Sequence, residues 1–119
     1  MSISFRGRTL VTDRGAVQLP WPVLVAVEQE DKVLVLLDPL SYLSDPGYKS
    51  ARRRGAPAVR NLVALTKAGE TLWEAQLPET SDYYYRIVSA SPLVANSCSS
   101  QRCEIDPDTG SIRKKESLR

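Results

Sequence analysis

The sequence predicts a single all-β domain built as an antiparallel meander of hairpins. Short runs of apolar and β-branched residues recur along the chain, each about five residues long, which is the length of a strand rather than of a helix. Between these runs lie clusters of Gly, Pro, Asp and Ser, the residues that favour tight turns. A chain of 119 residues has the size of one domain, so we assign residues 1–119 to a single unit.

Two hairpins carry the clearest signals. The first joins Val23–Val27 to Val33–Leu37 through a charged turn, and both strands are apolar on both faces, which predicts a central position in a sheet. The second joins Asn61–Leu65 to Glu70–Leu77 around Gly69, which supplies the positive φ of a tight turn. A helix is the competing interpretation of Glu70–Leu77, but eight residues followed by a proline make a poor isolated helix.

Further strands are expected toward both ends of the chain. Four candidates lie in the C-terminal third, at Tyr83–Ala90, Leu93–Asn96, Arg102–Ile105 and Ser111–Lys115. Three weaker candidates lie at the front, at Ile3–Phe5, Thr9–Val11 and Ala16–Leu19. Asp106–Gly110 is the strongest turn, because Asp caps it, Pro sets φ and Gly adopts the left-handed conformation. We expect residues 116–119 to be frayed.

One segment breaks the pattern. Residues 44–58 lack an apolar period and contain several Gly and Pro residues, which predicts a long, flexible loop. An overlapping segment, Lys49–Arg60, carries the one local charge asymmetry of the chain. Its basic residues are Lys49, Arg52, Arg53, Arg54 and Arg60. Beside Tyr48, these cations are candidate contacts for nucleic-acid phosphates. A solvated loop is the alternative, since the net charge of the chain is only +2.

No group of residues in the sequence points to catalysis. Histidine is absent, which removes the usual general base and the commonest metal ligand. Asp106 and Asp108 resemble the start of a calcium loop, but the further oxygen ligands are missing and a turn explains both residues. We therefore expect a non-enzymatic domain without a metal or a cofactor.

The two cysteines and the hydropathy of the chain bear on its compartment. Cys98 and Cys103 flank a short predicted turn, so they could face each other across a hairpin and form a disulfide. Two free thiols in a reducing cytoplasm are the favoured alternative. Arg6 and Arg8 stand where a signal peptide needs an apolar core, and no apolar run approaches the ~20 residues that cross a bilayer. A cytoplasmic location, with no membrane contact, is expected.

The aromatic residues are candidates for a partner surface. Tyr83 and Tyr85 should point to one face of a strand and Tyr84 to the other, so at least one of them is expected to be exposed or at an interface. Trp21 lies between two prolines and cannot belong to a central strand. Core packing is the alternative for most of these rings. The leading hypothesis is binding to another protein, or to a second copy, through a sheet edge and exposed tyrosines. Nucleic-acid binding and a small-ligand pocket near Trp73 are the alternatives.

Similar motifs recur along the chain at a spacing of about 40 residues, which is the period of a β-propeller blade. Two units resemble the PQQ-like (quinoprotein-type) β-propeller repeat. The matching residues are Ala64, Leu65, Gly69 and Trp73 in one unit and Asp106, Thr109 and Gly110 in the next. Thr66 stands where that repeat usually has Asp, and Lys114 stands at its Trp position. The layout of residues 17–115 is also similar to that of small uncharacterised single-domain bacterial proteins.

The resemblance implies propeller-blade-like hairpins but not a complete ring. A closed propeller needs ~4–8 blades of ~40 residues each, which is more than this chain supplies. We therefore expect an incomplete propeller, an open twisted sheet or a small sandwich, with no bound quinone. Uncovered edge strands invite pairing, which makes a homodimer an expectation as well.

Overall fold

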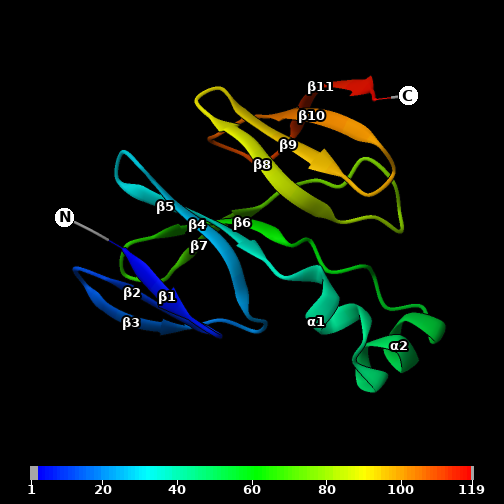
Figure 1. Cartoon of the computed structure of the whole chain (residues 1–119), viewed down its shortest axis with the longest axis horizontal. Coiled ribbons are helices and arrows are strands. Elements are labelled where there is room, and N and C mark those ends of the chain that lie inside the picture. The colour runs from blue at the N-terminus through cyan, green and yellow to red at the C-terminus, as the bar shows by residue number, and fades with distance from the viewer. Residues whose placement is uncertain (1–2, 119) are drawn as a thin grey trace.

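A computed structural model describes residues 3–118 and shows an all-β, sandwich-like fold of three antiparallel sheets (Figure 1). Strands account for 48% of the chain and helices for 11%, which confirms the predicted class. The sheets formed by residues 3–118 do not close into a barrel. Of the three arrangements left open by the sequence, the stacked, sandwich-like one is observed.

Each sheet is a meander in which neighbours in sequence pair in space. The N-terminal sheet comprises β1 (Ser4–Arg6), β2 (Thr9–Thr12) and β3 (Gly15–Gln18). The middle sheet comprises β4 (Val23–Gln29), β5 (Lys32–Leu37), β6 (Leu62–Thr66) and β7 (Thr71–Glu74). The C-terminal sheet comprises β8 (Tyr84–Ala90), β9 (Leu93–Ser97), β10 (Gln101–Ile105) and β11 (Ile112–Ser117). All the predicted strands are found, within a few residues of the expected ends.

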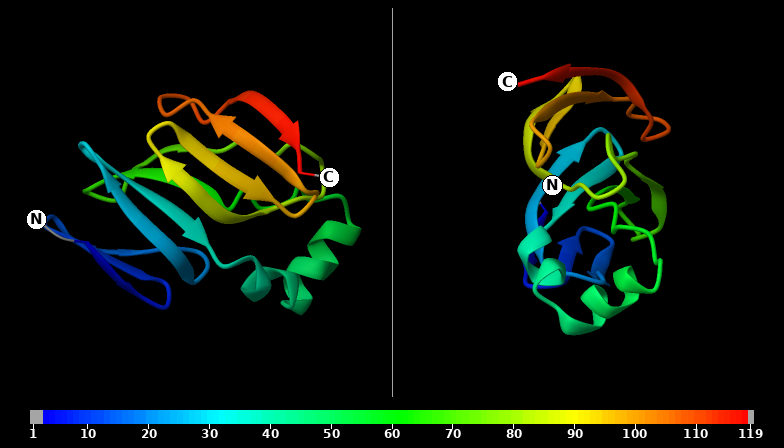
Figure 2. Two further views of the ribbon diagram at one scale, coloured as in Figure 1. Left: turned by 45° about the horizontal axis from the view of Figure 1, so that its top comes forward. Right: turned by 90° about the vertical axis from the view of Figure 1, so that its right-hand side faces the viewer.

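The middle sheet is buried on both faces because its inner strands are apolar on both faces. On β5, Leu34 and Leu36 pack toward the C-terminal sheet, while Val33 and Val35 pack toward the N-terminal sheet. The side chains of β6 alternate in the same way between the two clusters. The three sheets therefore form successive layers with the middle sheet between the other two (Figure 2). The prediction of a central position is confirmed for β5. It is wrong for β4, which lies at the sheet edge beside β1.

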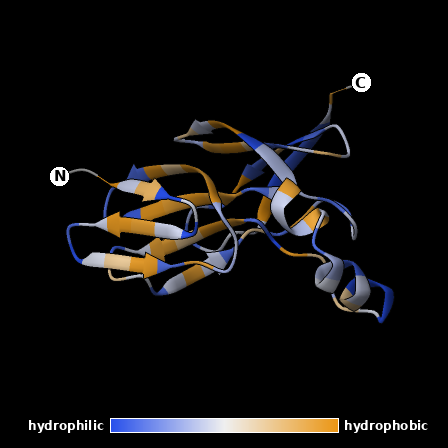
Figure 3. Cartoon of the chain, turned by 60° about the horizontal axis from the view of Figure 1, so that its bottom comes forward, coloured by the Kyte–Doolittle hydropathy of each residue, from blue (hydrophilic) through white to orange (hydrophobic). Residues whose placement is uncertain are grey.

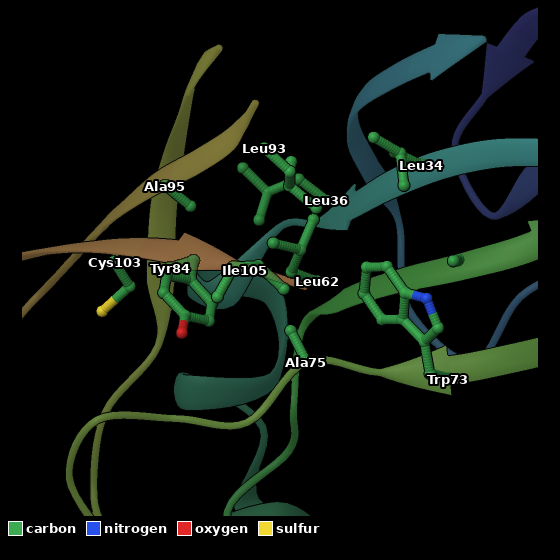
Figure 4. Packing of buried hydrophobic residues seen from close by; sticks show 11 residues of the cluster. Leu34, Leu36, Leu62, Trp73, Ala75, Tyr84, Leu93, Ala95, Cys103 and Ile105 are labelled. Atoms are coloured by element: carbon green, nitrogen blue, oxygen red, sulfur yellow. The ribbon is translucent and has the colours of Figure 1, made fainter. Parts of the chain in front are cut away.

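Trp73 joins the middle sheet to the C-terminal sheet (Figure 4). Its indole Nε1 donates a hydrogen bond to the carbonyl of Pro107, 2.9 Å away, in the turn between β10 and β11. Gly110 of the same turn lies against the ring, so close that an added Cβ would be 2.7 Å from Trp73 Cε3. The two residues come from the two units that resemble the PQQ-like repeat. The predicted turn at Asp106–Gly110 thus serves as a packing surface for the neighbouring sheet.

Asn61 ties together the ends of three strands in the two four-stranded sheets. This fully buried side chain donates to the carbonyls of Leu37 and Tyr84, at 3.0 and 2.7 Å, and accepts a 2.9 Å bond from the Tyr84 N–H. The backbone carbonyl of Asn61 accepts a further hydrogen bond, from the N–H of Leu37. Asn61 therefore satisfies backbone groups at the points where β5 ends, β6 begins and β8 begins.

The prediction of a flexible loop at residues 44–58 is wrong over most of that segment, because Pro46–Arg53 form a helix. The connection between β5 and β6 contains two short helices, α1 (Pro39–Leu43) and α2 (Pro46–Arg53). Each begins with an aspartate whose carboxylate accepts a backbone N–H, followed directly by proline. Proline suits the first position of a helix because no N–H is needed there, so the Asp-Pro pairs start helices rather than break them.

The C-terminal end also differs from expectation. Residues 116–119 were expected to fray, but β11 extends to Ser117, which pairs with Gln101. The N–H of Leu118 then donates to the carbonyl of Ser100. Pairing with β10 therefore orders residues 116–118, and Arg119 lies outside the described residues.

Replacing Asn61 with alanine is expected to lower the free energy of unfolding by about 3 kcal/mol, because backbone groups of Leu37 and Tyr84 would be left buried without partners. Urea unfolding followed by circular dichroism measures this loss. Asn96→Ala is the matched control, because Asn96 is also buried but accepts one bond, from Arg102, and its loss is expected to cost only about 1 kcal/mol. Equal losses in the two variants would contradict the bridging role of Asn61.

Gly110→Ala is expected to destabilise the protein by about 3 kcal/mol, since the new Cβ meets the Trp73 ring in addition to the cost of the positive φ. Gly55 is the control position, because its φ is also positive, at 97°, and nothing lies within 4 Å of its added Cβ. Gly55→Ala should cost about 1 kcal/mol. Thermal unfolding monitored by tryptophan fluorescence compares the two, and similar costs would show that contact with Trp73 is unimportant.

Candidate functional site

The basic segment of the sequence forms one wall of a groove beside α2. Lys49, Arg52 and Arg53 lie three and four residues apart, a spacing that places them on one side of a helix. The groove has a volume of about 410 Å³, and these cations share its lining with the side chains of Leu43, Tyr48 and Tyr83. We call this hollow the basic groove. Figure 3 shows the end of α2 as a hydrophilic tip of the molecule.

Side-chain hydrogen bonds to the backbone and to Ser81 hold the walls of the basic groove in place. Arg52 donates to the carbonyl of Ala56 at 2.6 Å and to the Ser81 hydroxyl at 2.7 Å, so it ties the segment before β8 to the end of α2. The Tyr48 hydroxyl accepts a 3.2 Å bond from the N–H of Val59. Arg52 is therefore mainly a positioning residue, whereas Lys49 and Arg53 make no such contact within residues 3–118.

The cations of this region form no ion pairs with acidic side chains of residues 3–118. Within the described part of the chain, none of Lys49, Arg52, Arg53, Arg54 and Arg60 forms an ion pair; the four ion pairs found there involve other residues. Arg54 instead donates to the hydroxyl of Ser50 at 2.7 Å. No acidic residue occurs between Pro46 and Arg60. The cations of the groove are therefore not held in ion pairs with carboxylates of the described residues.

An aromatic cluster of Trp21, Tyr42 and Tyr48 adjoins the basic groove, because Tyr48 also belongs to the lining of the groove. The rings of Tyr42 and Tyr48 meet edge to face with centroids 5.0 Å apart, and Trp21 lies 5.6 Å from Tyr42 and 6.3 Å from Tyr48. Trp21 is thus outside any strand, as predicted, but it is half-buried in this cluster. Burial, followed by the nearby hydroxyls of Tyr48 and Tyr83, raises the pKa of Tyr42. Its hydroxyl is buried and has no hydrogen-bond partner among residues 3–118.

The three consecutive tyrosines do not form one surface. Tyr85 is exposed, which confirms that at least one of them reaches solvent, and Tyr83 is half-buried in the wall of the basic groove. Tyr84 is completely buried, and its hydroxyl donates to the carbonyl of Gln76 at 2.5 Å. The assignment of Tyr84 to a partner surface is therefore wrong, because this ring belongs to the core between two sheets.

The disulfide between Cys98 and Cys103 is not formed; both thiols are free. Cys103 pairs with Ala95 across the β9–β10 ladder and is buried in the core, whereas Cys98 is exposed in the turn beyond the end of that ladder. The two residues are therefore not opposed in register. A hydrogen bond with the Cys98 thiol, followed by burial, raises the pKa of Tyr83, and burial raises the pKa of Cys103.

The free edges of the two four-stranded sheets are poorly shaped for pairing with another strand. β7 is only four residues long, and β8 has two register shifts that interrupt a regular edge. β11 is charged along Arg113, Lys114 and Lys115. β4 is a longer edge, but β1 packs against it. These are features that natural sheets use to prevent edge pairing, so the basic groove is the better candidate for a partner surface.

A family model described as a domain of unknown function, DUF7957, matches residues 1–117. The chain belongs to this family. No curated protein and no solved structure matches it in the same comparisons. The resemblance to the PQQ-like repeat remains a prediction.

The other candidate sites of this DUF7957 domain have simpler structural roles. Trp73 is 7% exposed and packs into the core, while Thr71 and Glu74 line a cavity on the opposite face of β7. Asp106 uses its carboxylate to accept the N–H of Asp108 at 2.8 Å, which lowers the pKa of Asp106. Residues 3–118 contain no group of three or more His, Cys, Asp or Glu that could hold a metal ion. None of the helices described is long and apolar enough to span a membrane.

Tyr42→Phe is expected to raise the free energy of unfolding by about 1 kcal/mol, because it removes a buried hydroxyl that has no partner. Tyr84→Phe is the matched change in the other fully buried tyrosine and should lower it by about 1 kcal/mol, since the bond to Gln76 is lost. Urea titrations of both variants measure the difference. A clear loss of stability in Tyr42→Phe would mean that its hydroxyl has a partner.

Proposed function

We propose that this DUF7957 domain is a non-enzymatic, cytoplasmic protein-binding module that recognises an acidic segment of a partner at the basic groove. The observation that carries the proposal is the set of cations along α2 that have no carboxylate partner in the described part of the chain and that border an apolar and aromatic hollow. The absence of histidine from the chain is consistent with a binding role.

The composition of the groove suits protein recognition. Unpaired cations at the wall of a hollow create a local positive potential, which attracts acidic segments and speeds their encounter. Arginine and tyrosine are also the residues that most often dominate the energy of protein interfaces. Arg53 and Tyr83 supply these types here, and Leu43 adds an exposed apolar contact at the mouth. An acidic segment with an apolar anchor would complement both features.

Nucleic-acid binding through Lys49–Arg60 is the second candidate, favoured by the same cations beside Tyr48. Binding to a phosphate backbone usually uses a long track of cations and shows a steep dependence on salt. Here only three cations line a compact hollow, and the guanidinium of Arg52 already donates hydrogen bonds to Ala56 and Ser81. The net charge of the chain is only +2. These observations favour a short acidic segment over a nucleic acid.

The test is fluorescence anisotropy with labelled probes of equal length: a Glu-rich peptide with two leucines, the same peptide with Lys in place of Glu, and an oligouridylate. We expect the acidic peptide alone to bind, with an affinity that falls as salt rises. The double variant K49E/R53E should weaken binding about tenfold or more.

The double variant K114E/K115E is the control, because both lysines are exposed on β11 and the change in net charge is the same. It should bind the acidic peptide as well as the unmodified chain does. Equal weakening in the two double variants would reduce the effect to net charge and overturn the assignment of the groove. Preferential binding of the oligouridylate would replace the proposal with the nucleic-acid alternative. Sedimentation at rising concentration, in the same buffers, tests self-association as the competing use of the groove.

A further inference from the structure

The ladder between β6 and β7 ends at a defined point, and a hollow opens beyond it. The last backbone bond of the ladder runs from the N–H of Ala75 to the carbonyl of Leu62, and these two residues lie close together (Figure 4). Beyond this pair the chain continues as residues 57–60 on one side and as residues 77–81 on the other. Both segments line a hollow of about 620 Å³, and we call it the strand gap.

Arg52 ties the two segments together again at the other end of the strand gap. Its guanidinium donates to the carbonyl of Ala56 at 2.6 Å and to the hydroxyl of Ser81 at 2.7 Å, so one side chain reaches both segments. Arg52, Ala58 and Ser81 line the strand gap and the basic groove alike. The strand gap is therefore fixed at both ends, by the last ladder bond and by Arg52, and it adjoins the basic groove.

The backbone groups of Ala58 and Arg60 are turned toward the strand gap. Backbone bonds alternate in direction along this stretch: the carbonyl of Leu62 bonds on the side of β7 and that of Asn61 on the side of β5. The N–H of Val59 then bonds to the hydroxyl of a tyrosine in α2. Since successive residues of an extended chain direct their backbone groups to opposite sides, Ala58 and Arg60 face the side of β7. Both residues line the strand gap, whereas Val59 does not.

These backbone groups have no partners within the part of the chain that the structure describes. Neither the N–H nor the carbonyl of Ala58 and Arg60 forms a hydrogen bond with another of residues 3–118, and the same holds for Leu77 and Glu79 on the opposite segment. Arg60 and Glu79 are exposed, and Ala58 and Leu77 are half-buried, so the strand gap is open to solvent. Accessible backbone donors and acceptors along an extended chain are the groups to which a peptide strand can add.

The charge of the combined path favours an acidic peptide. The strand gap alone does not select an anion, because its cations Arg52 and Arg60 are accompanied by the carboxylate of Glu79. The adjoining basic groove adds Lys49 and Arg53 and no carboxylate. Four cations and one carboxylate therefore line the two hollows together, which attracts an acidic segment and repels a basic one.

We infer that the acidic segment of the partner binds as an extended strand, which runs from the basic groove past Arg52 into the strand gap and pairs there with the backbone of Ala58 and Arg60. This inference rests on the proposed function, and it adds the conformation of the bound segment and a second, uncharged part of the contact. The basic groove supplies the attraction between charges, and the strand gap supplies backbone hydrogen bonds, as in other complexes in which a peptide adds a strand to a sheet.

The experiment compares a short Glu- and Leu-containing peptide of five residues with long forms that carry five further Ser and Val residues at either end. In fluorescence anisotropy one long form should bind about tenfold more tightly than the short peptide, although the extension adds no charge. N-methylation throughout the extension removes its N–H donors and should abolish this gain. Amide hydrogen exchange followed by NMR should slow about tenfold or more at Ala58 and Arg60 with the long form, and should be unchanged with the short one.

The variant K49E/R53E is the control for the basic groove, and it should weaken the short and long peptides by the same factor. Binding of the short peptide with no gain from either extension would overturn the inference and leave the proposed function standing. Equal affinities of the methylated and unmethylated long forms would overturn the backbone pairing. If no acidic peptide binds, the proposed function fails and the inference fails with it. Slower exchange at Ala58 and Arg60 with rising protein concentration alone would show that a second copy fills the strand gap, and would also overturn the inference.

Discussion

The whole arrangement depends on the burial of β5 and β6 on both faces. Their side chains alternate between two separate core clusters, so each face of the middle sheet requires its own cover. One cover is the N-terminal sheet and the other is the C-terminal sheet. Removing either layer would expose a continuous apolar surface, which soluble domains avoid. The need for a layer on each side of the middle sheet therefore follows from the hydropathy of two strands.

Specific polar contacts fix the positions of the layers, since apolar packing alone tolerates sliding. Asn61 joins the ends of β5, β6 and β8 through buried backbone groups, and the Nε1 of Trp73 reaches the turn between β10 and β11. On the opposite side, the hydroxyl of Thr12 donates to the carbonyl of Lys67 at 2.6 Å and connects the N-terminal sheet to the β6–β7 turn. Each interface thus combines a large apolar contact with at least one buried or half-buried hydrogen bond.

Most of the strands could be predicted because their signals are local. The apolar runs at β5 and β6 and the turn residues at Gly69 and Asp106–Gly110 determine pairing between neighbours in sequence. The two helices could not be predicted from hydropathy because they are short and begin with proline. Pro46 counted toward a loop at residues 44–58, although Asp45 before it is a good helix cap, and Asp38 caps the helix at Pro39 in the same way. The burial of Tyr84 and the exposure of Cys98 depend on how sheets stack and where a ladder ends, which the alternation of one strand does not reveal.

The basic groove and the cavity lined by Thr71 and Glu74 both border the connection between β5 and β6. This connection leaves the middle sheet at Leu37 and returns at Asn61, where the N–H of Leu37 donates to the backbone carbonyl of Asn61 and the Asn61 side-chain amide donates to the carbonyl of Leu37. Between these anchors the chain forms α1 and α2, which border the basic groove, and the extended segment 57–60, which borders the cavity lined by Thr71 and Glu74. Ala58 contributes to the lining of both hollows. Because the anchors are fixed within the core, the intervening residues are free to vary in charge and shape without loss of the sheets. Lys49, Arg53, Arg54 and Arg60 are therefore placed in the connection rather than in a strand, while Tyr42 and Tyr48 tie that connection to Trp21.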